Sequence, residues 1–282
     1  MIMVMASRSG GSSSSTLNNM ANNSFSWSLT GSSSQYAYRD NADCVDLGES
    51  GGTDPNLIMA WVKPTSTSHM VICSHTTGFD DASDMPDGGF EFSITSDGSG
   101  GYKPYVWLYQ FRGTPPNFNP QIFTTTGTGP TTGSWHHLAF YAYGVFPYTS
   151  SDVRFYIDGS YVETINNSNS GSFDSSGGAY SQVNSAKFMA GAVFGEDTSI
   201  YGCWDGGIDE LILARVSSTT EADTFVSTYY QSCAVPQGNG NFLFNNNYLD
   251  SSGNGNTLTP VNSPTFSPNR PFTCFVPQVM II

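Results

Sequence analysis

The chain has 282 residues, of which 38% are hydrophobic and 14% aromatic. Nine lysine and arginine residues stand against 23 aspartate and glutamate residues, which gives a net charge of −14. This charge repels phosphate groups and argues against nucleic acid as a partner. The apolar runs are far shorter than the ~20 residues that cross a bilayer as a helix, which argues against membrane insertion.

Short apolar runs separated by Gly, Ser, Thr and Asn predict many strands joined by turns. The first pair lies in SFSWSLTGSSSQYAYRD, where Phe25, Trp27 and Leu29 alternate with polar residues. A hairpin is predicted in VRFYIDGSYVETI, with Asp158-Gly159 as its turn. The strands expected in chain order fall within residues 24–40, 56–64, 69–75, 89–98, 105–111, 134–144, 153–165, 186–195 and 202–216.

A helix is predicted after these strands, in SSTTEADTFVSTYY. Ser218 and Glu221 form an S-x-x-E capping box at its start. The apolar residues Ala222, Phe225, Val226 and Tyr229 then recur at helical spacing. The helix should therefore lie with one face against the strands.

Three segments in this order resemble the concanavalin A-like lectin/glucanase superfamily, in its laminin G-like branch. The family's W-H-H-V-A strand and D-G hairpin resemble SWHHLAF and RFYIDGSYV, and its closing strand and helix resemble GGIDELILARVSSTTEADTFV. The opening SFSWSLTGSSSQYAY is similar to the family's first strand pair. The resemblance implies an all-β fold, a two-sheet antiparallel jelly-roll sandwich with one short C-terminal helix and irregular terminal extensions.

The expected organisation has three parts. Residues 1–23 form a Ser/Gly-rich arm without the basic and apolar regions of a secretory signal. Residues 24–232 form the laminin G-like sandwich. Residues 233–282 are rich in Asn, Gly and Pro. They complete this sandwich, begin a truncated second module, or donate strands to a neighbour.

Three carboxylates, Asp205, Asp209 and Glu210, gather in GCWDGGIDELILARV. Regular strand alternation predicts that Asp209 and Glu210 point to opposite faces, with Asp209 beside Leu211 and Leu213. Such a pair does not suit glycoside hydrolysis, in which two carboxyl groups flank one bond. The hydrolases of the resembling superfamily carry an E-x-D-x-(x)-E strand, which this chain lacks. The sequence therefore predicts a protein without catalytic activity.

Two places are candidates for calcium. The resemblance implies that Asp209 either helps to bind Ca²⁺ near Gly31 or is held by hydrogen bonds alone. The loop FDDASDMPDGG concentrates carboxylate oxygens, the ligands that Ca²⁺ prefers. A solvated acidic loop is the other interpretation. The loop carboxylates are Asp80, Asp81, Asp84 and Asp87.

Histidine and cysteine provide weaker signals. His136 and His137 are expected to pack and form hydrogen bonds within the family strand rather than to bind a metal. The five cysteines have no C-x-x-C spacing, so a zinc site is not indicated. They are read as reduced and buried thiols, with two disulfides and one free thiol as the alternative.

An aromatic row marks one predicted strand, YVWLYQF. Alternation places Tyr105, Trp107, Tyr109 and Phe111 on one side. Such a row can stack against sugar rings or serve as a protein interface. The alternative is that the following loop covers it and makes it part of the core.

Both termini are apolar, with MIMVM at the start and FVPQVMII at the end. Apolar segments that are too short to span a membrane are best covered by a neighbouring subunit. The residues expected at such assembly contacts are Met1, Ile2, Met3, Phe275, Val276, Val279 and Ile281.

The function expected from the sequence is that of a non-catalytic binding protein. We expect it on the surface of a virus or phage particle or of a filament, as a decoration or receptor-binding protein that contacts other subunits and cell-surface glycan. A glycoside hydrolase or lyase of the same superfamily is one alternative. A secreted cell-surface adhesin module is the other. Fold alone does not decide among them.

Overall fold

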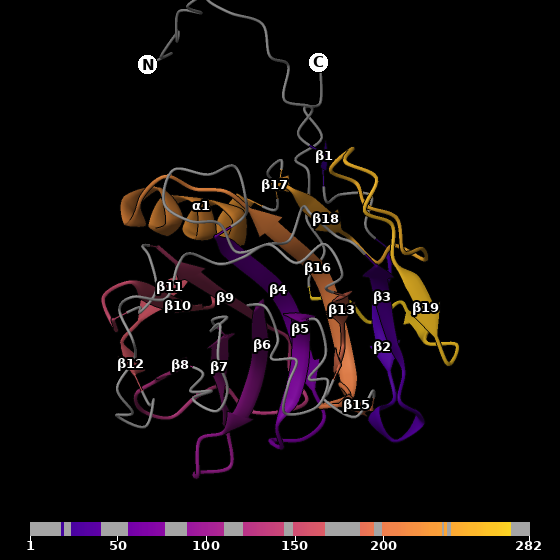
Figure 1. Cartoon of the computed structure of the whole chain (residues 1–282), viewed down its shortest axis with the longest axis horizontal. Coiled ribbons are helices and arrows are strands. Elements are labelled where there is room, and N and C mark those ends of the chain that lie inside the picture. Colours follow the sequence, from indigo (N-terminus) through magenta and orange to yellow (C-terminus); the bar gives the residue numbers. More distant parts are fainter. Residues whose placement is uncertain are drawn as a thin grey trace, which may run out of the picture.

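The computed structural model describes residues 18–19, 24–40, 56–76, 89–109, 121–143, 149–166, 187–194, 199–232, 234–235 and 238–271. These residues form mainly antiparallel strands in two large sheets that pack face to face. Figure 1 shows the strands of both sheets, with α1 near β9, β10 and β11. The predicted all-β, two-sheet sandwich is confirmed. Within this part of the chain, no helix is long and apolar enough to span a bilayer.

The first sheet has the strand order β11-β10-β9-β4-β16-β2-β20, and β18 also pairs with β16. Its central strand β16 carries the predicted closing motif. The bounds are β2 (Ser26–Leu29), β4 (Leu57–Pro64), β9 (His136–Ala142), β10 (Val153–Ile157), β11 (Ser160–Val162), β16 (Gly206–Ala214), β18 (Gly240–Phe242) and β20 (Thr265–Ser267).

The second sheet has the strand order β12-β8-β7-β6-β5-β13-β3-β19. Two short pairs lie beside the large sheets, β1 with β17 and β14 with β15. The bounds in the second sheet are β3 (Tyr36–Asp40), β5 (Met70–Thr76), β6 (Gly89–Ser96), β7 (Tyr102–Tyr109), β8 (Gln121–Thr125), β12 (Thr164–Asn166), β13 (Lys187–Ala190) and β19 (Thr259–Val261). Those of the short pairs are β1 (Asn18–Asn19), β17 (Ala234–Val235), β14 (Val193–Phe194) and β15 (Ile200–Tyr201).

The main core lies between the two sheets. Phe92 of the second sheet meets Phe140 of the first edge to face, with ring centroids 4.9 Å apart. Trp27 is fully buried and stacks on Phe244 at 4.7 Å. Burying each such ring contributes about 1.5–3 kcal/mol. Alternation along the strands therefore supplies a continuous apolar interior.

Helix α1 (Thr219–Ser232) covers part of the outer face of the first sheet. The Glu221 N–H donates to the Ser218 hydroxyl at 3.2 Å, and the Glu221 carboxylate accepts from the Ser217 N–H at 2.6 Å. The predicted capping box is thus confirmed, with Ser217 as the second partner. The buried residues Ala222 and Val226 pack on the sheet.

A β-bulge interrupts β16 at Glu210 and corrects the predicted facing of its side chains. The register with β4 slips by one residue between Asp209 and Ile212, and Glu210 has a left-handed φ of 50°. Asp209 is aligned with Trp61 and Ile212 with Met59, and these neighbours pack beneath α1. Leu211 and Leu213 instead belong to the main core. The prediction that Asp209 shares a face with these leucines is wrong, because the extra residue shifts the alternation.

The C-terminal extension adds strands to both sheets. β18 pairs with β16 and β20 with β2 in the first sheet, whereas β19 pairs with β3 in the second. Phe242 and Phe244 are buried in the main core. The described residues of this extension therefore complete the same sandwich, which is the first of the three alternatives considered for residues 233–282.

Candidate functional site

The outer face of the second sheet carries a group of polar and aromatic side chains on two neighbouring strands. Glu91 of β6 is aligned with Trp107 of β7, and Ser93 with Tyr105. The residues between them, such as Phe92 and Val106, point into the core. Period-two alternation therefore places these four side chains together. We call Glu91, Ser93, Tyr105 and Trp107, together with His69 beside them, the aromatic face.

Glu91 is the buried charge of the aromatic face. Its side chain is 6% exposed, and its carboxylate oxygen Oε1 lies 2.7 Å from the ring nitrogen Nε2 of His69. The hydrogen bond to Glu91 raises the pKa of His69 in spite of partial burial, so the pair favours a protonated imidazole. A carboxylate that is already paired in this way is a fixed hydrogen-bond acceptor.

Tyr105 and Trp107 are both partly exposed. Their ring centroids are 6.1 Å apart and their planes are tilted by 54°. The His69 ring meets Tyr105 edge to face at 6.4 Å. The two aromatic residues therefore form adjacent inclined surfaces rather than the flat platform that a simple strand suggests.

The remaining residues of the predicted aromatic row lie beyond what the structure describes. Tyr109 ends β7, but its side chain is outside the described set, and Phe111 is outside the described residues altogether. The row is therefore established for Tyr105 and Trp107 alone.

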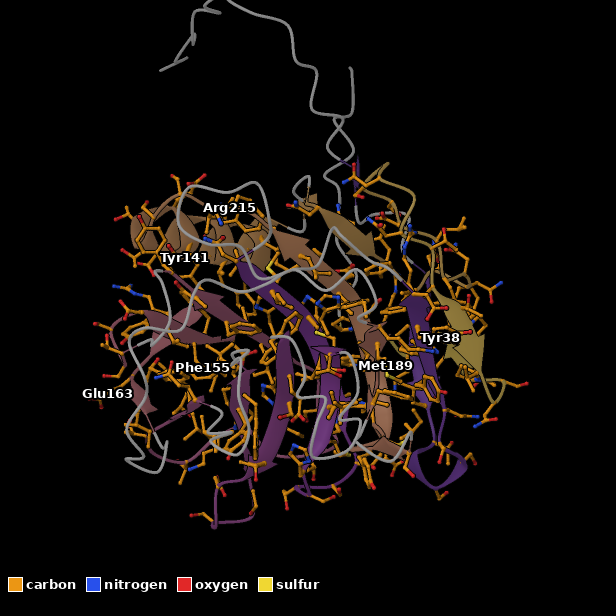
Figure 2. The ribbon with its side chains drawn as sticks, viewed as in Figure 1. Tyr38, Tyr141, Phe155, Glu163, Met189 and Arg215 are labelled. Carbon is orange, nitrogen blue, oxygen red and sulfur yellow. The ribbon has the colours of Figure 1, made fainter. Side chains whose placement is uncertain are left out.

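A cation–π contact and an ion pair join β3 and β13 of the same sheet. Tyr38 is aligned with Met189, and both are labelled in Figure 2. The Lys187 ammonium lies 5.1 Å from the Tyr38 ring centroid and 3.3 Å from the Asp40 carboxylate. Because its charge is already paired, Lys187 serves first to hold the two strands together.

The carboxylates of the closing strand lie under α1. Asp209 is 0% exposed and Glu210 is 3% exposed. The Tyr229 hydroxyl donates a hydrogen bond to Glu210, and the Glu210 N–H donates to Asp209 at 3.0 Å. Both side chains thus share the helix side of the sheet, away from solvent. A polymeric substrate cannot reach them in this arrangement.

The carboxylate beside Gly31 is that of Asp205. It accepts a hydrogen bond from the Gly31 N–H at 3.3 Å and one from the Thr65 hydroxyl at 2.5 Å. Asp205 therefore joins the first turn to the start of β16. Among the described residues, no group of three or more His, Cys, Asp or Glu side chains is placed to hold a metal ion.

Several predicted site residues fall outside the described part of the chain. They are the calcium candidates Asp80, Asp81, Asp84 and Asp87 and the assembly candidates Met1, Ile2, Met3, Phe275, Val276, Val279 and Ile281.

The two histidines of β9 have different partners. His136 Nδ1 lies 2.8 Å from the Asp158 carboxylate, and the His137 N–H donates to the same side chain at 2.9 Å. Asp158, with a left-handed φ of 49°, thus ties the hairpin turn to β9. The His137 ring is fully buried against Trp61 and Tyr229.

Two of the five cysteines are described, and both are free thiols. Cys73 is buried, and burial raises the pKa of its thiol well above the usual value. It therefore behaves as a small apolar core residue.

Residues 31–221 match the family profile described as the concanavalin A-like lectin/glucanases superfamily. The chain belongs to this superfamily. Its laminin G-like profile spans the opening turn, the WHH strand, the hairpin and the closing strand described above. No curated protein sequence is similar enough to count as a relative of this concanavalin A-like chain.

Solved structures share the fold at low sequence identity. A native heptameric SAP-like pentraxin from Limulus polyphemus is 14% identical, with a TM-score of 0.52, over 87% of this chain and 95% of that one. The enzymatically active domain of tailspike protein 2 from bacteriophage CBA120 is 17% identical over 73% of this chain and 25% of that one. Its TM-score is 0.36. The pentraxin supports the assignment of the fold, and at this identity it supports nothing further.

Proposed function

We propose that this concanavalin A-like chain is a non-catalytic carbohydrate-binding protein whose sugar site is the aromatic face of the second sheet. The observation that carries the proposal is the juxtaposition of two partly exposed rings, Tyr105 and Trp107, with the paired carboxylate of Glu91. Sugar rings present C–H faces that pack on aromatic rings and hydroxyl groups that need fixed polar partners. The aromatic face offers both within two adjacent strands.

The chemistry of each group suits this role. Glu91 is an acceptor for sugar hydroxyl groups, and His69 holds its orientation through the 2.7 Å contact. The Ser93 hydroxyl donates to the Tyr105 carbonyl oxygen at 3.3 Å and is fully buried, so it helps to hold β6 and β7 together beneath the two rings. The inclined rings of Tyr105 and Trp107 suit a bent sugar chain better than a flat one.

The absence of catalysis is part of the proposal. Hydrolysis needs two carboxyl groups that face the same glycosidic bond. Asp209 and Glu210 are adjacent, but both are buried beneath α1. Glu91 faces outward, where its partner is His69. These positions support binding over bond cleavage.

The test is a glycan array probed with the intact chain and with Trp107→Ala and Tyr105→Ala. Each variant should lose at least tenfold in affinity for the best glycan. Tyr161→Ala is the matched control, because Tyr161 is 50% exposed on β11 of the other sheet. Binding that survives both substitutions contradicts the aromatic face as the site. Release of reducing ends from a bound glycan contradicts the non-catalytic part and favours the hydrolase or lyase alternative.

We also propose that the chain is displayed on a virus or phage particle or a filament, where it contacts other subunits. The apolar composition of residues 1–5 and 275–282 supports this part, because a neighbouring subunit would remove their side chains from water. Deleting both segments should leave a folded chain that no longer joins its particle or oligomer. Unchanged assembly of the truncated chain contradicts the display proposal and leaves the cell-surface adhesin alternative.

A further inference from the structure

A pocket of about 180 Å³ opens on the outer face of the first sheet, where residues 63 and 206–207 lie beyond the parts of β4 and β16 that pack against α1. It is smaller than the roughly 300–1,000 Å³ of pockets that hold drug-sized ligands. Its volume therefore suits one small ring. The side chains used below come from Ser28, Lys63, Trp135, Ser267 and Asn269, and Gly206 and Gly207 are also part of the lining.

The floor of the pocket is set by strand register. Lys63 of β4 and Ser28 of β2 are both aligned with Gly207 of β16, so they flank the same glycine. Ser28 is in turn aligned with Thr265 of β20. Neighbours in register point to the same face of a sheet. Gly207 contributes no side chain, which leaves open space between the lysine and the serine.

One wall of the pocket is the indole ring of Trp135. A Cβ atom on Gly207 would lie 2.5 Å from a ring carbon of Trp135, so the ring passes directly over the glycine. The Trp135 Nε1–H donates to Asn269 Oδ1 at 3.0 Å. The ring is thereby tied to the C-terminal segment on the other side of the pocket. These contacts fix both its position and its tilt.

Lys63 supplies a positive charge at this wall. Within the described part of the chain it forms no ion pair, whereas Arg154 is paired with Asp223 at 3.0 Å and Lys187 with Asp40 at 3.3 Å. Among the described residues the Lys63 ammonium is therefore available to an anion. Its place beside hydroxyl groups and an indole ring suits an anion that is also polar and cyclic.

We infer that this pocket binds a carboxylated sugar residue, with the carboxylate on Lys63 and the sugar ring against Trp135. The hydroxyl groups of Ser28 and Ser267 and the exposed amide of Asn269 are then partners for the sugar hydroxyls. The site is separate from the aromatic face, because it lies on the other sheet. The inference therefore stands without the proposed function.

The test measures binding of three sugars to the intact chain by calorimetry. The probes are a glucuronic acid tetrasaccharide, sialyllactose and a neutral glucose tetrasaccharide. At least one of the two carboxylated sugars should bind at least tenfold more tightly than the neutral one. The tighter of the two shows whether the pocket prefers the carboxylate of a glucuronic acid or that of a sialic acid. Equal affinity for all three, or no binding of either carboxylated sugar, overturns the inference. Acetate that competes as well as the sugars also overturns it, because it reduces the site to simple anion binding.

Substitutions locate the binding. Lys63→Gln should weaken the carboxylated sugar at least tenfold, and Lys103→Gln, which removes a charge from the second sheet, should not. Gly207→Ala, which displaces the Trp135 ring, should weaken binding without changing any charge. Trp107→Ala should leave this affinity unchanged, which separates failure here from failure of the aromatic face. Wild-type affinity in Lys63→Gln overturns the assignment.

Discussion

The Tyr229 hydroxyl donates a hydrogen bond to the carboxylate of Glu210, and both side chains are buried between α1 and the first sheet. Burial raises the pKa of Tyr229 well above its usual value, and the adjacent Glu210 carboxylate raises it further. The bulge at Glu210 is what turns this side chain toward the helix. One irregular residue in β16 thus provides a buried polar contact to α1, in addition to the contact of Asp223 with Arg154 of β10.

Tyr229→Phe should lower the free energy of unfolding by about 1–3 kcal/mol, because it removes the hydroxyl donor from a buried carboxylate. Urea denaturation followed by circular dichroism measures the effect. Tyr161→Phe on the exposed edge strand is the control and should change stability little. Equal stability of the two variants would show that the buried contact contributes nothing.

Asp209 is expected to stabilise the fold, and the calcium prediction for it and for the loop around Asp80–Asp87 can be tested in the same experiment. Asp209→Ala should cost about 1–3 kcal/mol, because the Glu210 N–H loses its acceptor. Adding Ca²⁺ should raise the melting temperature of the wild-type chain, and chelation should reverse the change. If Asp209 is a ligand, Asp209→Ala abolishes the rise, and if the loop is the site, the variant keeps it. A wild-type melting temperature that does not respond to Ca²⁺ removes both sites.

The buried histidines should make the fold sensitive to acid. Burial lowers the pKa of His137 to about 3 and that of His75 to about 4. An unfolded histidine takes up its proton near pH 6.5, so between about pH 6.5 and 4 the unfolded state binds more protons than the native state. Stability should therefore fall as the pH is lowered through this window, by an amount on the order of a few kcal/mol.

Denaturant titrations at several pH values measure this dependence. His137→Phe should flatten it, because phenylalanine does not titrate and neither ring nitrogen of His137 has a hydrogen-bond partner among the described residues. The dependence of stability on pH that remains in His137→Phe should come in part from His75. If the wild-type chain keeps constant stability from pH 7 to pH 4, both histidines are protonated in the native state and the prediction is wrong.

His69 should behave in the opposite way. The hydrogen bond that the His69 ring donates to the Glu91 carboxylate raises the pKa of His69 above its usual value. The stabilisation from this pair is fully present below pH 6.5 and is lost as the pH rises through the native pKa of His69. A proton NMR titration of the His69 ring should show the raised pKa, and Glu91→Gln should lower it. A His69 pKa that is the same in both proteins would contradict the pairing.

The sequence by itself determined the fold class and the positions of its turns and of the helix start. Alternation of Phe90, Phe92 and Ile94 with polar residues indicates a strand with one apolar face, and the structure places these three residues in the core. The Asp158-Gly159 turn and the capping residues Ser218 and Glu221 were also predictable. The turn and the cap each depend on residues that are only a few positions apart, so a short stretch of sequence is enough to predict them.

Tertiary structure alone decided which side chains meet. The bulge at Glu210 places Leu211 and Leu213 on the opposite face of the sheet from Asp209. No local sequence pattern predicts this bulge, because it depends on the pairing of β16 with β4. The pocket around Lys63 likewise joins β2, β4, β16 and β20, which are far apart in the chain. Sequence periodicity gives the face of one strand, whereas a site needs the register between strands. That register is set by packing across the whole sandwich.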